Sequence, residues 1–196
     1  MLSSAAIHTL RQQGALRWPG PLRGDALLLR LGAPLQPLAA PAQAQPVDLL
    51  DQASIDRLYL PPLLGWASFT LRPGQLVLCR VADPLRLSPQ LGGWIATLSH
   101  LARVGLMSHL ASPAIMPGWN GHLTLELHNA GPAPLLLRRG MPAAKALLYR
   151  LEGPPSQAPP SPYYGTSTHL GSRYADEFAA TPFTVTASVD RDERGG

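Results

Sequence analysis

The sequence has 196 residues, of which 45% are hydrophobic and 14% are charged, and its formal net charge is +4. This length and composition predict one compact domain with a core of its own. The single cysteine, Cys79, excludes an internal disulfide and a cysteine-rich metal site. The sequence shows neither an apolar run near the roughly 20 residues of a membrane helix nor a secretory signal, so we expect a cytoplasmic protein.

The first expected element is a short helix, which Ser3 or Ser4 caps and which extends to Gln13 before Gly14 ends it. Residues 25–31 are predicted to form a buried strand that Gly32 closes. Residues 33–47 are rich in Ala, Pro and Gln and are expected to be irregular. Residues 47–60 are compatible with either a helix or an extended segment.

Short apolar segments with Pro/Gly turns between them fill most of the remaining chain. They predict strands over residues 67–71, 75–81, 93–98, 122–128, 135–137 and 143–151. Many short strands with little helix indicate an all-β sandwich or barrel-like fold. From residue 153 onward the chain is rich in Pro and Ser, which is typical of a tail.

The stretch from Ser99 to Glu126 carries the polar residues of most interest. Ser99 and Arg103 are four residues apart, so a helical turn would place both on one face, and Gly105 would end that turn. A tight turn is predicted at residues 117–121. In the strand that follows, three leucines share one face, and Glu126 lies on the other with His122, Thr124 and His128. A carboxylate in a half-buried strand costs folding free energy unless it is paired with another group or takes part in function.

Three motifs in this order, SxLARVGL, IxPGWxGxLxLELxN and PLxLRRGM, resemble the dCTP deaminase branch of the dUTPase superfamily. The weaker segments DALLLRLG and LRPGQLVLCRVADPLRLSPQLGGWI extend the resemblance over most of residues 5–152. The resemblance implies a mainly β, dUTPase-like distorted jelly-roll or barrel subunit with one or two short helices. It also implies a domain over residues 1–152 and a homotrimer with active sites where subunits meet. The tail over residues 153–196 is either an active-site lid, as the resemblance implies, or a solvated end without a role in the site.

The resemblance further implies hydrolytic deamination of a deoxycytidine nucleotide without a metal at the base. Glu126 matches the glutamate that takes a proton from water, and Ser99 and Arg103 match the residues that support it. The expected partners are a deoxynucleotide substrate and further copies of the chain. Neither nucleic acid nor a membrane is an expected partner. Mg²⁺ is expected only as an ion bound to the phosphates of the nucleotide. The positions expected to contact the substrate are His100, His109, Ser112, Trp119, Arg173 and Tyr174.

Zinc-dependent cytidine deaminases need several cysteines to hold their metal, and this chain has one. Any deamination is therefore expected to follow the metal-free route. Tyr163 and Tyr164 are candidates to cover a ligand once the tail closes.

Three positions depart from the family pattern. Leu98 stands where the family has a phosphate-gripping arginine, His100 replaces a serine, and Met116 replaces an aspartate. Because of these changes, a second function is also compatible with the sequence: a non-catalytic nucleotide- or protein-binding module, in which Glu126 and Arg103 form a structural pair. A dUTPase-type pyrophosphatase ranks third because Met116 cannot serve as a base.

Overall fold

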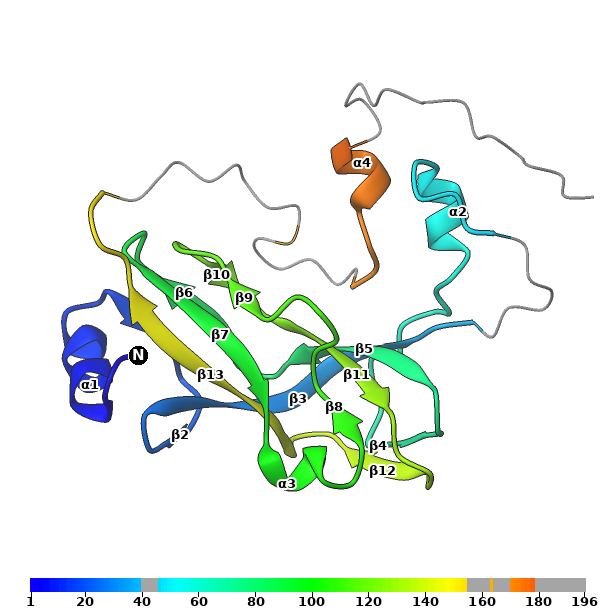
Figure 1. Ribbon diagram of the computed structural model, residues 1–196, viewed down its shortest axis with the longest axis horizontal. Helices are drawn as coiled ribbons and strands as arrows, with labels where there is room; N and C mark the ends of the chain where they lie inside the picture. The colour runs from blue at the N-terminus through cyan, green and yellow to red at the C-terminus, as the bar shows by residue number, and fades with distance from the viewer. Residues whose placement is uncertain (40–45, 155–162, 164–169, 179–196) are drawn as a thin grey trace, which may run out of the picture.

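The computed structural model describes residues 1–39, 46–154, 163 and 170–178, and antiparallel strands dominate it (Figure 1). In these ranges the helices are short: α1 (Ser4–Gln12), α2 (Gln52–Asp56), α3 (Ser99–Ala102) and α4 (Tyr174–Phe178). None of them has the length and apolar character needed to cross a bilayer.

The largest sheet has the strand order β8-β11-β5-β3-β13-β7-β9, with β2 pairing to β3, and it curls around the core. Two small sheets complete the fold, β1-β6-β10 and β12-β4. The strands are β1 (Leu16–Arg17), β2 (Leu22–Arg23), β3 (Ala26–Pro37), β4 (Ser68–Leu71), β5 (Leu76–Val81), β6 (Leu85–Leu87), β7 (Leu91–Thr97), β8 (Leu106–Met107), β9 (Ala114–Ile115), β10 (Asn120–Gly121), β11 (Thr124–Asn129), β12 (Leu135–Arg138) and β13 (Pro142–Arg150). This is a mainly β fold with short helices, as the sequence predicts.

The longer predicted strands and the first helix agree with the observed ones, whereas the short strands β1, β2, β6, β8, β9 and β10 and the helix α4 were not predicted. Helix α1 has Ser3 as its cap, whose hydroxyl accepts from the amide of Ala6 at 3.3 Å. The segment that had two options contains helix α2, which Asp51 caps through the amide of Ala53 at 2.9 Å. The expected helical turn at Ser99 forms α3, where the amide of Arg103 donates to the carbonyl of Ser99.

Two predictions about this part of the chain are wrong: Gly32 does not close the strand expected over residues 25–31, and residues 33–37, which were expected to be irregular, belong to the same strand. Strand β3 continues through Gly32 to Pro37, and its pairing with β5 shifts register between Leu31 and Leu35. A Cβ at Gly32 would lie 2.7 Å from the Cα of Ala82, so the glycine permits a close approach of two backbones. Glycine in a strand often marks such an irregularity rather than an end.

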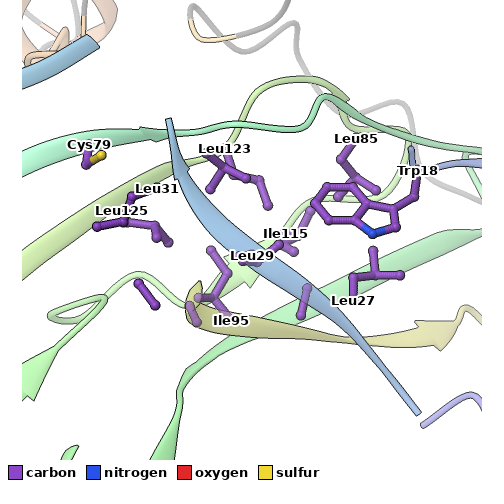
Figure 2. Close-up of a cluster of buried hydrophobic side chains, with 14 of the residues drawn as sticks. Trp18, Leu27, Leu29, Leu31, Cys79, Leu85, Ile95, Ile115, Leu123 and Leu125 are labelled. Carbon is purple, nitrogen blue, oxygen red and sulfur yellow. The ribbon is translucent and has the colours of Figure 1, made fainter. Parts of the chain in front are cut away.

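Leucine and other apolar side chains from both sides of the curled sheet fill one core (Figure 2). Strand β11 shows how the sequence builds it: Leu125 and Leu127 are fully buried, whereas the alternating residues remain partly exposed. Cys79 also belongs to the core, and burial raises the pKa of its thiol to about 12. The protonated, inaccessible thiol is unsuited to act as a nucleophile.

The described part of the tail packs against α2 (Figure 1). Its Leu170 and Ala175 are buried, and Tyr59 and Gln52 fix its backbone. The amide of Ser172 donates to the hydroxyl of Tyr59 at 3.0 Å, and the side-chain amide of Gln52 donates to the carbonyl of Ser172 at 2.8 Å. This segment is therefore held by specific polar contacts as well as by apolar burial.

Truncation of a core leucine should be far more costly than truncation of an exposed one. Leu125 is 0% exposed and Leu136 is 53% exposed. We expect Leu125→Ala to lower the free energy of unfolding by about 2–5 kcal/mol, because it removes buried methyl groups and leaves a cavity. Leu136→Ala should lower it by less than about 1 kcal/mol. Urea denaturation of both variants measures this, and equal losses would contradict the core assignment.

Removal of the Tyr59 hydroxyl should loosen the tail. Tyr59→Phe deletes the acceptor for the amide of Ser172, and we expect roughly fivefold faster hydrogen exchange at that amide, which corresponds to about 1 kcal/mol. Tyr174→Phe is the matched control, because Tyr174 is 41% exposed and its ring keeps the contact with Phe178. Unchanged exchange in Tyr59→Phe would show that this hydrogen bond does not hold the tail.

Candidate functional site

Glu126 lies in the middle of β11, opposite Leu78 of β5, and its side chain is on the partly exposed face of the strand. One carboxylate oxygen, Oε2, accepts a hydrogen bond from the backbone amide of Leu110 at 2.9 Å. The carboxylate is therefore fixed by the loop between β8 and β9. This places an acid of defined orientation at the edge of the core.

Glu126 lines a cavity of about 370 Å³, which we call the carboxylate cavity. This volume lies within the range of small-molecule sites. Most of the lining is apolar or aromatic, and the convergent polar groups are few. The lining residues are Tyr59, Leu78, Ile95, Ser112, Ala114, Trp119, Leu123, Thr124, Glu126, Tyr163, Leu170 and Ser172.

The loop that holds Glu126 is itself pinned at its start. Ser108 is fully buried; its amide donates to Oγ1 of Thr97 at 2.9 Å and its hydroxyl donates to the carbonyl of Ala143 at 2.8 Å. Gly105, which precedes β8, has a φ of 88°, and a Cβ there would collide with the backbone of Gly131. Glycine is thus required where the chain turns from α3 into this loop.

Three of the residues proposed from the sequence lie together: Ser112, Trp119 and Glu126 all line the carboxylate cavity. His109 is adjacent in sequence to Leu110, whose amide binds Glu126. Within the described part of the chain, Nδ1 of His109 is buried without a hydrogen-bond partner. It is therefore close to the site, although it does not line the cavity.

The tail covers part of the carboxylate cavity through Tyr163, Leu170 and Ser172. Burial raises the pKa of the Tyr163 phenol, whose oxygen accepts from the amide of Arg173 at 2.9 Å. Two predicted contact residues of the tail, Arg173 and Tyr174, do not line the cavity. The Arg173 guanidinium pairs instead with Asp176 at 3.0 Å. The neighbouring candidate Tyr164 lies outside the described residues.

Ser99 and His100 line a different cavity of about 320 Å³, which we call the basic cavity and define by Arg23, Asp25, Leu98, Ser99, His100 and Lys145. Arg103 is exposed at the end of α3. A single chain therefore does not bring Ser99 or Arg103 into the cavity of Glu126. That the three residues meet across subunits stays a prediction.

Sequence reasoning did not single out Tyr59, which lines the carboxylate cavity and holds the tail. It also passed over Arg23 and gave Lys145 no role. Tyr59 belongs to a segment without clear periodicity, and its role depends on contacts with residues more than 100 positions away. Among the described residues, no group of three or more His, Cys, Asp and Glu side chains could hold a metal ion.

One solved structure supports a shared fold. The 2′-deoxycytidine 5′-triphosphate deaminase from Agrobacterium tumefaciens matches with a TM-score of 0.57 and 20% identity, over 75% of this chain. The match spans 45% of the Agrobacterium protein. The native dUTPase of EIAV matches with a TM-score of 0.48 and 14% identity, over 76% of this chain and 98% of that protein.

A family model described as dCTP deaminase-like matches residues 1–151, which include the strands, α3 and Glu126. This confirms the resemblance carried by the three sequence motifs. The chain belongs to the dCTP deaminase-like family.

Proposed function

We propose that the protein is a hydrolytic deaminase of a deoxycytidine nucleotide, either dCTP or a related or modified cytosine nucleotide. Its products are the deoxyuridine nucleotide and ammonia, and no metal acts at the base. The observation that carries the proposal is the Glu126 carboxylate, which is held by the Leu110 amide in a mostly apolar cavity of about 370 Å³. Family membership supports the same activity.

The roles of the residues follow from this arrangement. Glu126 takes a proton from a water molecule, and the hydroxide forms a bond to the ring carbon that bears the amine. The double bond from that carbon to the adjacent ring nitrogen opens, and the ring nitrogen takes the proton from Glu126. The proton of the new hydroxyl then passes through Glu126 to the amine, the bond between carbon and the amine breaks, a carbonyl forms, and ammonia leaves. Proton transfer by a positioned side chain contributes typically 10²–10⁴-fold to such a reaction.

The apolar lining supports this chemistry in two ways. Leu78, Ile95 and Leu123 are buried side chains of the cavity lining and make the surroundings of the carboxylate less polar. Trp119 and Tyr163 supply flat surfaces suited to a pyrimidine ring. The hydrogen bond from Leu110 occupies Oε2, which leaves the other carboxylate oxygen for the water.

We further propose that the active form is a homotrimer and that Ser99 and Arg103 reach Glu126 from a neighbouring subunit. In one chain these residues lie outside the carboxylate cavity, whereas their exposure makes them accessible to another copy. The Arg103 guanidinium would offset the charge of the carboxylate, and the Ser99 hydroxyl would orient the water. In this scheme the part of the tail that lines the cavity, Tyr163, Leu170 and Ser172, acts as a lid over the site.

Replacement of Glu126 by glutamine should abolish most turnover. We expect kcat for ammonia release from dCTP to fall by at least about 10²-fold in Glu126→Gln, because glutamine cannot take the proton. Glu152→Gln is the matched control, because Glu152 is exposed and does not line the carboxylate cavity. Ammonia release is measured over a panel of cytosine nucleotides.

Equal turnover in Glu126→Gln and the wild type would contradict the proposed mechanism. Nucleotide binding without turnover in the wild type would instead favour the non-catalytic binding module, for which the departures at Leu98, His100 and Met116 argue.

Mixing two inactive variants should restore activity if the site is shared. In a homotrimer formed randomly from equal amounts of Ser99→Ala and Glu126→Gln chains, about one quarter of the sites would contain both wild-type residues. We expect activity to rise to about that fraction after subunit exchange by mild denaturation and refolding. Refolded single variants are the controls. No recovery in mixed trimers, verified by mass spectrometry, would place both residues in the site of one chain.

A further inference from the structure

The basic cavity contains two cations, Arg23 and Lys145, that form no ion pair with a carboxylate of the described residues. Within the described residues, the ion pairs are Arg30–Asp83 and Arg173–Asp176, so neither Arg23 nor Lys145 takes part in one. Lys145 is the only lysine of the chain. Two unpaired cations from different strands that line one cavity form a candidate anion site.

The position of Lys145 is unusual for a charged residue. It lies within β13, opposite Leu28 of β3 on one side and Ala96 of β7 on the other. The alternate residues Ala144 and Ala146 face the core and are fully buried, whereas Lys145 is only half-buried and lines the cavity. A cation in the interior of a sheet costs folding free energy unless it binds an anion or takes part in function.

The other polar groups of the basic cavity suit an anion as well. Asp25 is its one acid, and Oδ1 of Asp25 accepts from the amide of Ser4 at 2.5 Å, so this oxygen is committed to the start of α1. The Ser99 hydroxyl and the His100 ring supply further hydrogen-bonding groups. With His100 neutral, the lining side chains carry two positive charges and one negative charge.

We propose that the basic cavity binds the phosphate groups of the nucleotide, with Lys145 and Arg23 as the cationic contacts. The proposal rests on the proposed function for the identity of the nucleotide. The basic cavity and the carboxylate cavity share no lining residue in one chain, so the inference also rests on the proposed homotrimer, in which one subunit's basic cavity lies beside the Glu126 of its neighbour. Lys145 and Arg23 thus determine how tightly phosphorylated substrates bind.

The test uses calorimetry with inorganic tripolyphosphate as well as deamination kinetics. We expect Lys145→Met and Arg23→Gln each to weaken tripolyphosphate binding roughly tenfold, because each loses a charge-assisted contact. Both should raise KM for dCTP by a similar factor and leave KM for deoxycytidine unchanged. Arg150→Gln is the control on the same strand, since Arg150 is exposed and does not line the basic cavity.

A variant that should strengthen binding distinguishes an anion site from a merely structural role of the two cations. Asp25→Asn removes the one negative charge of the cavity, so tripolyphosphate should bind this variant more tightly than the wild type. If the protein shows no deaminase activity but binds tripolyphosphate in a manner that depends on Lys145, this inference is supported and the proposed function fails. An active deaminase whose tripolyphosphate affinity and KM for dCTP are unchanged by Lys145→Met and Arg23→Gln would overturn it.

Discussion

The hydrogen bond from the Leu110 amide to Glu126 joins the two parts of the molecule on which the site depends. Strand β11 buries Leu125 and Leu127 on one face, so the strand alternation directs Glu126 away from the core. The loop that supplies the amide is anchored at the buried Ser108. Neither element alone would orient the carboxylate. The position of the acid is thus a consequence of core packing on one side and of a pinned loop on the other.

The polar chemistry of the chain is divided between two cavities. The carboxylate cavity contains Glu126 and a mostly apolar lining suited to a base, whereas the basic cavity contains Lys145 and Ser99. The two cavities share no lining residue within one chain. A nucleotide carries both a base and phosphates, and a second copy of the chain is the simplest means of bringing the two kinds of cavity to one ligand.

Most of the fold could be predicted from the sequence because it rests on local signals. Alternation predicted β11 correctly, including which residues face the core, and the cap at Ser3 and the stop at Gly105 were visible as single residues. Gly32 was misinterpreted because a glycine that ends a strand and one that permits a close backbone contact look identical in sequence. The role of Tyr59 was invisible for a related reason, since it comes from a long-range contact with the tail.

The departures from the family pattern gain a physical meaning in this arrangement. Leu98 carries no charge, yet it lines the same cavity as Lys145 and Arg23, which come from strands distant from it in the sequence. A cation lost at one position can be replaced from another strand, because a phosphate group responds to the location of charge and to donor geometry, not to the backbone that supplies them. Lysine acts as a flexible point charge, whereas arginine presents a planar fork. The proposed phosphate site, with this altered set of cations, should therefore bind phosphates in an altered geometry. We expect this difference to change how the affinity for the nucleotide depends on the number of its phosphates.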